Sequence, residues 1–225
     1  TQSLPQKFFY AGPMFRYERP QKGRMRQFHQ IGCEYIGSFN PLADAEVIGC
    51  AAQFLSELGV LDSCKLHLNS LGDATSRDNY RTALIAFLSD YKSELSSDSY
   101  RRLNKNPLRI LDSKAEEDRE ILENVPQLPA FLTTQAKEHF ERVTKALDKA
   151  DINWQLDTNL VRGLDYYSHT AFEFITDALG SQGTVLGGGR YDGLSAMLGG
   201  PDIGAVGFAA GVERLALLIE QNDEF

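Results

Sequence analysis

Polar side chains on one predicted hairpin near the start of the chain have the types needed to hold a charged, aromatic ligand. Arg16 and Glu18 lie two residues apart, and Phe28, Gln30 and Glu34 keep the same even spacing. Side chains alternate between the faces of a strand, so each set projects from a single face. An aromatic ring can stack on a base, while Arg and Glu bind groups of opposite charge. The pattern also fits the solvent face of an ordinary antiparallel sheet, so both interpretations remain open here.

Two further segments carry residues suited to a polar ligand. Arg162 is followed closely by the pair Tyr166-Tyr167, just before an alternating stretch. Tyr hydroxyls donate and accept hydrogen bonds, which suits an aromatic or imidazole ligand, although two aromatics at the edge of a core would look the same. Arg214 lies near the start of a predicted helix, where the helix dipole does not stabilise a cation. An anionic partner for Arg214 is therefore a hypothesis beside that of a surface arginine.

Glycine is concentrated toward the end of the chain. Eleven of the nineteen glycines fall within residues 180–211, among them the run 187–189 that precedes Tyr191. Glycine inside strands often marks the close approach of a ligand or of another backbone. The sequence contains no G-x-x-x-x-G-K-[ST], and no G-x-G-x-x-G opens a helix after a strand, so Walker and Rossmann nucleotide sites are not expected.

Composition limits the class of protein further. The net charge of −8 argues against general affinity for nucleic acid, so any RNA contact needs a local basic patch such as residues 16–26. No run of eighteen apolar residues is present, and no membrane span or signal peptide is expected. Cys33, Cys50 and Cys64 form no CxxC pair, and with four His they offer no metal-ligand spacing. Reduced cysteines of this kind point to the cytoplasm.

Periodicity predicts the elements that must position these side chains. Residues 13–36 read as two strands joined by a polar loop, and helical spacing follows over about 43–58. Further strands are expected at 64–68, 152–158 and 170–176, and a last helix over about 208–221. Residues 72–151 are rich in charged residues, poor in Gly and marked by two amphipathic stripes. We therefore predict an α+β fold, in which residues 1–71 and 152–225 form an antiparallel sheet flanked by helices and residues 72–151 form a mostly helical insertion.

Taken together, these segments resemble a known family. Residues 14–20 and 28–34 are similar to motif 2 of histidyl-tRNA synthetases, and residues 207–215 to motif 3 of class II synthetases. Residues 162–167 and 188–193 resemble the two histidine-specific motifs of that family. The resemblance covers nearly the whole chain. It implies the core of a class II enzyme that joins L-histidine to ATP as an adenylate, releases pyrophosphate, and transfers histidine to the 3′ end of its tRNA.

The resemblance also implies a role for individual residues. Arg16 and Arg162 would be catalytic, since both would stabilise the charge that develops on the ATP α-phosphate. The residues implied for ATP binding are Arg16, Glu18, Arg24, Phe28 and Arg214. Those implied for histidine binding are Arg16, Gln30, Glu34, Arg162, Tyr166, Tyr167 and Tyr191. Mg²⁺ is expected with ATP as substrate, while no metal site is expected in the chain itself.

Parts of the family pattern are not found. Motif 1 and the anticodon-binding domain have no counterpart, and the chain begins with Thr1, so we expect a catalytic-domain fragment whose full-length protein forms a homodimer. The main alternative is a non-catalytic, synthetase-like regulatory subunit of ATP phosphoribosyltransferase, the first enzyme of histidine biosynthesis. A synthetase-like domain of a kinase that senses uncharged tRNA is a third possibility. Both alternatives predict degenerate motifs, whereas Arg16, Arg162 and Arg214 are all retained.

Overall fold

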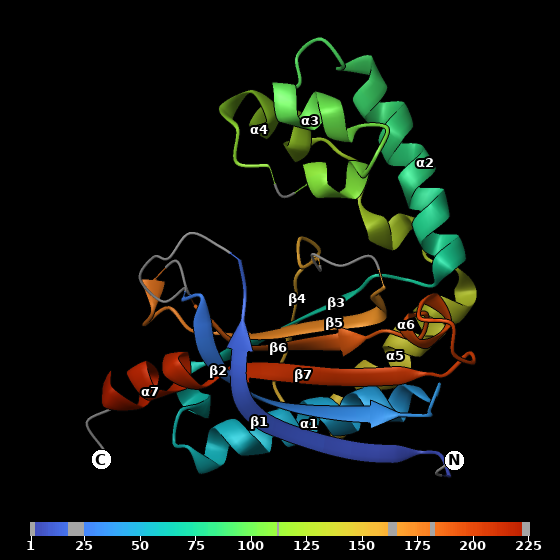
Figure 1. The fold of residues 1–225 in the computed structure, drawn as a ribbon. Coiled ribbons are helices and arrows are strands. Elements are labelled where there is room, and N and C mark those ends of the chain that lie inside the picture. The colour runs from blue at the N-terminus through green and yellow to red at the C-terminus, as the bar shows by residue number, and fades with distance from the viewer. Residues whose placement is uncertain (1–2, 18–24, 112, 162–165, 181–182, 222–225) are drawn as a thin grey trace.

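The chain folds around a mixed sheet in a computed structural model that describes residues 3–17, 25–111, 113–161, 166–180 and 183–221. The described strands form one sheet in the order β1-β2-β7-β6-β5-β3-β4, antiparallel except for the β3–β4 pair (Figure 1). The strands are β1 Gln6–Phe15, β2 Gln27–Ile36, β3 Lys65–Ser70, β4 Gln155–Leu156, β5 Ser168–Ile175, β6 Thr184–Arg190 and β7 Ala205–Gly211. This arrangement confirms the predicted α+β fold with an antiparallel sheet.

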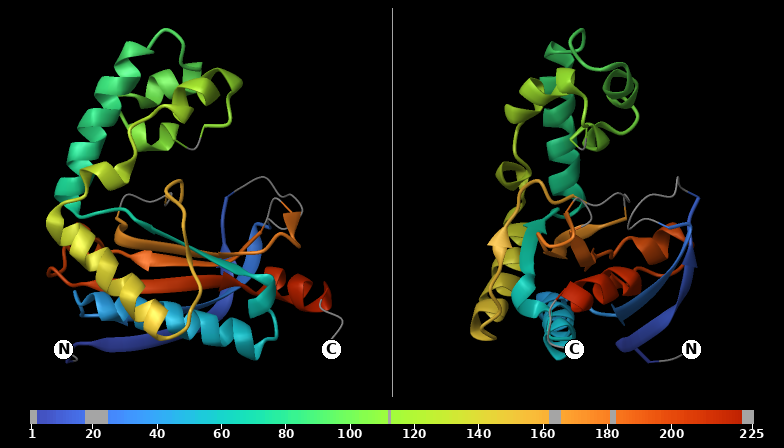
Figure 2. Two further views of the ribbon diagram at one scale, coloured as in Figure 1. Left: turned by 180° about the vertical axis from the view of Figure 1, so that it is seen from behind. Right: turned by 90° about the vertical axis from the view of Figure 1, so that its left-hand side faces the viewer.

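Helices cover one face of this sheet and leave the other face for a site. The α-helices are α1 Pro41–Glu57, α2 Ala74–Asp90, α3 Ser97–Arg102, α4 Glu116–Glu123, α5 Thr134–Lys149, α6 Leu194–Met197 and α7 Val212–Gln221. The 3₁₀ helices are η1 Leu61–Ser63, η2 Pro107–Ile110 and η3 Leu128–Phe131. Seen from behind, α1 and α5 lie across the back of the sheet (Figure 2).

The main core lies between that face and its helices. Ile48 and Leu55 of α1 pack with Leu218 of α7 against Phe172 and Phe174 of β5, and all five side chains are buried. Burial of large apolar side chains is the main stabilising contribution to such a layer. Helix α1 begins at Pro41 because Asn40 accepts a hydrogen bond from the Leu42 N–H at 3.1 Å.

A second hydrophobic cluster holds together residues 74–131, which we call the inserted unit. Its centre is made of buried apolar side chains from α2, η2 and α4 and from the residue that follows α3, namely Tyr80, Leu84, Leu88, Leu103, Ile110 and Ile121. Figure 1 shows this unit standing away from the sheet, with α2 rising from the end of β3. The predicted insertion, residues 72–151, also takes in α5, whose Val143 and Leu147 pack in the main core.

Three predicted elements differ from the structure. The last helix was expected from residue 208, which is wrong because residues 205–211 form β7 and the helix begins at Val212. Val206 and Phe208 face the core, while Gly207 and Ala209 lie on the opposite face. The alternation of a strand is therefore present, but it is hard to recognise in the sequence because glycine and alanine are not polar. The strand expected over 152–158 is reduced to Gln155–Leu156. The first strand, expected from residue 13, runs over Gln6–Phe15.

Candidate functional site

The open face of the sheet contains a cavity of about 340 Å³ where β2, β6 and β7 meet, which we call the first cavity. Its floor consists of small residues, Gly187 of β6 and Ala209 and Gly211 of β7. Small side chains at the centre of a sheet leave room for a ligand to approach the backbone. Phe28 and Gln30 of β2 line the same space.

Two guanidinium groups converge on the first cavity. Arg16 donates from Nε to the Met25 carbonyl oxygen at 2.9 Å, and its guanidinium carbon lies 4.3 Å from the centre of the Phe28 ring. Arg214, in the first turn of α7, donates from Nη1 to the Thr184 carbonyl oxygen at 2.6 Å. An aromatic ring with cations on its borders suits a planar ligand that carries negative charge. The guanidinium that stacks on Phe28 here belongs to Arg16, while Arg214 lines the same cavity.

A second group of polar side chains, which we call the tyrosine–glutamate cluster, consists of Tyr10, Glu34, Tyr166, Tyr167 and Tyr191. Tyr191 donates a hydrogen bond from its hydroxyl to the Glu34 carboxylate. The Tyr166 and Tyr167 ring centres are 4.7 Å apart, and the Tyr167 ring meets Tyr191 edge-on at 6.3 Å. Glu34 and the cavity-lining residues of β2 are on one face of that strand, as the even spacing predicted, so the cluster and the first cavity share the open face.

Two glycines make this cluster sterically possible. A Cβ placed on Gly207 would lie 1.8 Å from Oε2 of Glu34. A Cβ on Gly32 would lie 2.3 Å from the Tyr10 ring. Neither contact can be accommodated without moving the acidic or the aromatic side chain. These glycines of β2 and β7 therefore define where the carboxylate and the Tyr10 ring lie.

Burial tunes the charges in the tyrosine–glutamate cluster. Burial raises the pKa of Glu34, and the hydrogen bond from Tyr191 opposes that shift. Burial and then the negative charge of Glu34 raise the pKa of Tyr10. The cluster thus combines one carboxylate, which accepts hydrogen bonds, with tyrosine hydroxyls, which can donate or accept them. Such a set complements a ligand with one ring N–H and one ring lone pair.

Tyr10 was not predicted as a site residue. It pairs with Gly32 across the β1–β2 hairpin, and its side chain fills the space that Gly32 leaves. The hairpin register, once known, identifies Tyr10, because an aromatic residue opposite a glycine projects over it. Three predicted site residues, Glu18, Arg24 and Arg162, lie outside the described residues, and their roles stay predictions.

Behind Tyr191, a buried ion-pair network fixes the end of β6. Arg190 is fully buried and donates to both carboxylate oxygens of Asp44, to Asp192 at 2.8 Å and to the Ser38 carbonyl oxygen at 2.8 Å. Burial alone would raise the pKa of Asp44, but hydrogen bonds from His139 and Arg190 hold that pKa below its usual value. The network joins β6 to α1, so the backbone that carries Tyr191 is anchored at the residue before it.

His169, at the edge of this network, gives the fold an acid-sensitive group. It adopts a left-handed backbone conformation with φ of 48°, and its ring stacks on His139 at 4.3 Å. Burial, and then the charges of His139 and Arg190, lower the pKa of His169 from 6.5 to about 4. Within the described residues, its Nδ1 has no hydrogen-bond partner.

We therefore expect the protein to lose stability between pH 6.5 and pH 4. The unfolded chain binds a proton to His169 below pH 6.5, whereas the folded chain does so only near pH 4. The resulting loss, up to about 3 kcal/mol, begins as the pH falls through 6.5 and levels off near 4. Protonation of Glu34, whose pKa is raised, changes the stability in the opposite direction over the same fall in pH.

Urea denaturation at several pH values would measure the slope of the free energy of unfolding against pH. The variant His169→Asn should flatten this slope, and asparagine is chosen because it tolerates positive φ. An unchanged slope in that variant would contradict the assignment.

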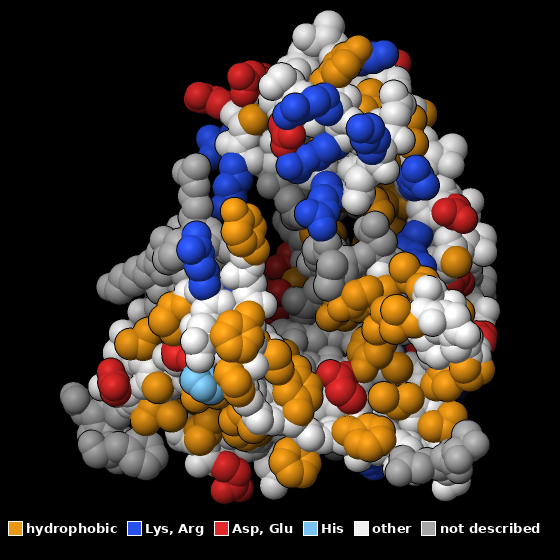
Figure 3. Space-filling view, in the orientation of Figure 1, with side chains coloured by type: hydrophobic (Ala, Val, Ile, Leu, Met, Phe, Trp, Pro, Cys, Tyr) orange, Lys and Arg blue, Asp and Glu red, His pale blue; other side chains and the backbone are white. Residues whose placement is uncertain are grey.

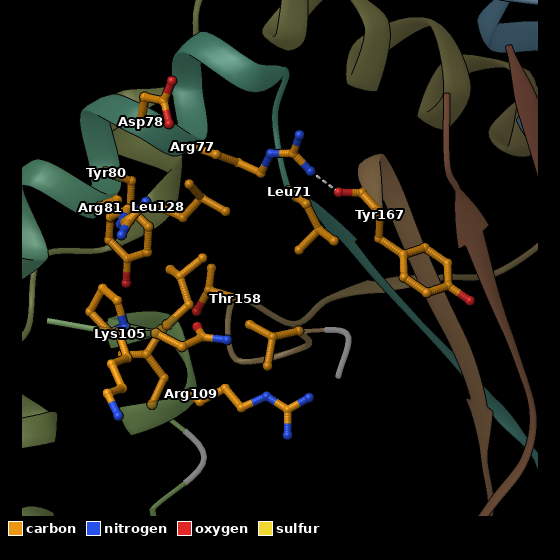
Figure 4. Close-up of a pocket in the computed structure, with 15 residues that line it drawn as sticks. Leu71, Arg77, Asp78, Tyr80, Arg81, Lys105, Arg109, Leu128, Thr158 and Tyr167 are labelled. Atoms are coloured by element: carbon orange, nitrogen blue, oxygen red, sulfur yellow. Dashed lines mark hydrogen bonds between the residues drawn. The ribbon is translucent and has the colours of Figure 1, made fainter. Parts of the chain in front are cut away.

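A second cavity, of about 320 Å³, lies between the inserted unit and the core (Figure 4). Four basic residues line it, Arg77 and Arg81 of α2 together with Lys105 and Arg109. Figure 3 shows Lys and Arg side chains gathered on the inserted unit, although the chain as a whole is acidic. Such a local patch is what an acidic protein needs to bind a polyanion.

The described part of the chain has neither a membrane-spanning helix nor a metal-binding cluster of side chains. No described helix is long and apolar enough to cross a membrane. No group of three or more His, Cys, Asp or Glu among those residues is placed to hold a metal ion.

Comparison with known proteins identifies similar chains. A family model described as histidyl-tRNA synthetase matches residues 1–215. The histidine–tRNA ligase of Gluconacetobacter diazotrophicus is 56% identical over 220 residues, which are 98% of this chain and 53% of that protein. The crystal structure of apo histidyl-tRNA synthetase from S. aureus superposes with a TM-score of 0.80 at 39% identity, over 98% of this chain and 52% of the other.

A more distant structure shares the fold alone. An ATP phosphoribosyltransferase regulatory subunit/histidyl-tRNA synthetase from Bacillus halodurans superposes with a TM-score of 0.59 at 21% identity, over 97% of this chain and 59% of the other. The chain spans about half the length of the curated relatives it matches.

Proposed function

Because the chain belongs to the histidyl-tRNA synthetase family, we propose that its full-length protein is a histidine–tRNA ligase. It activates L-histidine with ATP to give histidyl-adenylate and pyrophosphate, and then transfers histidine to the 3′ end of its tRNA. The observation that carries this proposal is the placement of the tyrosine–glutamate cluster beside the first cavity on one face of the sheet. A site for a polar ring and a site for a charged planar group are thus adjacent, as the joining of two substrates requires.

The first cavity is proposed to bind ATP. Phe28 offers a ring for the adenine, and Arg214 lies close enough to line the same space. Arg16, at the border of the cavity, is proposed to hold the α-phosphate as it reacts, with Arg162 on its other side. Preplaced cations of this kind stabilise the charge of the transition state. Glu18 and Arg24 are proposed to make further contacts with the nucleotide.

The tyrosine–glutamate cluster is proposed to bind the histidine side chain. The Glu34 carboxylate, held by the hydroxyl of Tyr191, accepts a hydrogen bond from one imidazole nitrogen, and a hydroxyl of Tyr166 or Tyr167 donates to the other. A substrate without these ring atoms would leave buried polar groups unpaired, which is how the site would reject amino acids of similar size. Gln30, which lines the first cavity on the same strand, is proposed to bind the α-amino group.

The regulatory-subunit alternative has less support. It predicts the loss of some substrate-binding Arg and Tyr residues, but Arg16, Arg162, Arg214, Tyr166 and Tyr167 are all present. The 56% identical relative is a histidine–tRNA ligase, whereas the structure whose title includes a regulatory subunit is 21% identical and bears on the fold alone.

Further partners belong to the same proposal. Mg²⁺ would arrive with ATP, held by phosphate oxygens. Glu213, the carboxylate among the described residues lining the first cavity, already accepts a hydrogen bond from the His29 N–H at 2.8 Å.

The basic second cavity would contact the tRNA backbone. A homodimer is supported by the large apolar side chains that the edge strand β1 exposes, of which Phe9 is 83% and Phe15 73% exposed. We place the protein in the cytoplasm, where tRNA and ATP are available.

We expect the full-length protein to catalyse ATP–pyrophosphate exchange that depends on histidine. Glu34→Gln should raise the KM for histidine about 10- to 100-fold, because a charged hydrogen bond contributes roughly 1.5–3 kcal/mol. The KM for ATP should change little in that variant. Glu57→Gln, at an exposed position of α1, is the matched control and should behave as the wild type. Absence of exchange in the intact wild type, or exchange with an amino acid other than histidine, would refute the proposal.

A further inference from the structure

The inserted unit reaches the tyrosine–glutamate cluster through one of its own arginines. Arg77, at the start of α2, donates a hydrogen bond to the main-chain oxygen of Tyr167. Figure 4 shows this bond, and it shows the Tyr167 ring pointing away from the basic side chains of the second cavity. That ring packs against the Tyr166 ring at an interplanar angle of 32° and meets Tyr191 edge-on. Tyr167 therefore touches the inserted unit with its main chain and the cluster with its side chain.

The base of α2 is tied to the strand that follows Tyr167. The His169 N–H donates to the Gly72 carbonyl oxygen at 2.8 Å. Asp73 caps the helix by accepting from the Ser76 N–H at 2.7 Å, and its other carboxylate oxygen accepts from the Thr133 hydroxyl. These bonds join the first turn of α2 to β5 and to the start of α5. The guanidinium of Arg77 thus projects from an anchored position.

The Tyr167 ring has little space to adopt another position. A Cβ on Gly189 of β6 would lie 3.1 Å from the ring, which shows how closely the ring covers that strand. Tyr167 also packs against the hydrophobic cluster of the inserted unit, to which Leu160 and Ala171 contribute from the core. A small rotation of its main chain would therefore move the hydroxyl relative to Glu34 and Tyr191.

We propose that Arg77 is a positioning residue for histidine binding, acting from the inserted unit through the main chain of Tyr167. This rests on the proposed function, since Tyr167 is taken to bind the imidazole. The hydrogen bond from Arg77 holds the Tyr167 carbonyl group. Because the side chain is attached to the same Cα, this bond also orients the Tyr167 ring. Misplacement of a binding group by about 1 Å is enough to weaken catalysis strongly. Docking of the inserted unit and affinity for histidine are thereby coupled, and each influences the other equally.

The test uses ATP–pyrophosphate exchange by the full-length protein without any tRNA. Arg77→Ala should raise the KM for histidine about 10-fold or more and leave the KM for ATP within about 2-fold. Arg77→Lys, which can still donate to the carbonyl, should recover part of the loss. Arg101→Ala, an exposed arginine of α3 in the same unit, should match the wild type.

Other outcomes would overturn the positioning role. An unchanged KM for histidine with slower charging of tRNA would mean that Arg77 acts on RNA. A parallel rise of both KM values with a lower Tm would mean that Arg77 acts on folding. Calorimetric titration with histidine alone separates this proposal from the proposed function. A wild type that binds histidine without exchange would refute the ligase, while weaker binding by Arg77→Ala would still support positioning.

Discussion

Replacing Arg16 by Ala should slow histidine-dependent ATP–pyrophosphate exchange about 10²- to 10³-fold, equivalent to about 3–4 kcal/mol of barrier. Its guanidinium is held over the Phe28 ring and by the Met25 carbonyl oxygen, so it is oriented before substrate arrives. A preplaced cation of this kind stabilises charge without reorganisation during the reaction. We expect the loss mainly in kcat, because the charge on the α-phosphate grows in the transition state.

The hairpin provides the matched control for this experiment. Arg26 is exposed, and its guanidinium lies 6.0 Å from the Tyr17 ring, outside the first cavity. Arg26→Ala should change exchange by less than about 3-fold, since Arg26 does not line the first cavity, where ATP is proposed to bind. Equal effects of Arg16→Ala and Arg26→Ala would mean that Arg16 contributes only general positive charge, and its catalytic role would then be wrong.

Replacing Asp44 by Ala should destabilise the fold by about 3–5 kcal/mol, the usual cost of leaving a buried charge without its partner. Asp44 and Arg190 are both fully buried, and Arg190 Nε lies 3.1 and 3.0 Å from the two carboxylate oxygens of Asp44. The remaining contact with Asp192 does not compensate, because that carboxylate is already engaged. Urea denaturation of the variant and the wild type measures the difference in the free energy of unfolding.

An exposed ion pair supplies the comparison. Asp98 pairs with Arg101 at 3.1 Å on the surface of the inserted unit, and Asp98→Ala should cost less than about 1 kcal/mol. The two variants remove the same chemical group from a buried and from a solvated environment. If Asp44→Ala were no more destabilising than Asp98→Ala, the buried network would not be an important source of stability.

Much of the candidate site followed from local patterns in the sequence. The even spacing of Phe28, Gln30 and Glu34 predicted their common face, and the structure places that face on the open side of the sheet. The family resemblance, which rested on the motifs as a group, is confirmed by the match over residues 1–215. The roles of individual residues remain predictions until substrates are tested.

What could not be predicted depends on contacts between distant segments. Tyr10 belongs to the site only because the hairpin register sets it opposite Gly32. Residues 205–211 have too little hydrophobic contrast to reveal a strand, and pairing with β2 and β6 on either side decides their conformation. Arg190 lies in a glycine-rich run that suggested a ligand contact nearby, and its burial against Asp44 of α1 has no local signal.

The strand order also has a consequence for the chain as it leaves the ribosome. β2 pairs with β7, so Gln30 lies opposite Gly211, and these partners are joined by almost the whole length of the chain. The nascent polypeptide must therefore wait for β7 before the β1–β2 hairpin can join the other strands, whereas the inserted unit makes mostly local contacts and can collapse earlier. Until then the hydrogen-bonding edge of β2 that pairs with β7 has no partner. A translational pause before residue 205 would thus expose a template for aggregation, and chaperone binding should be strongest in that interval.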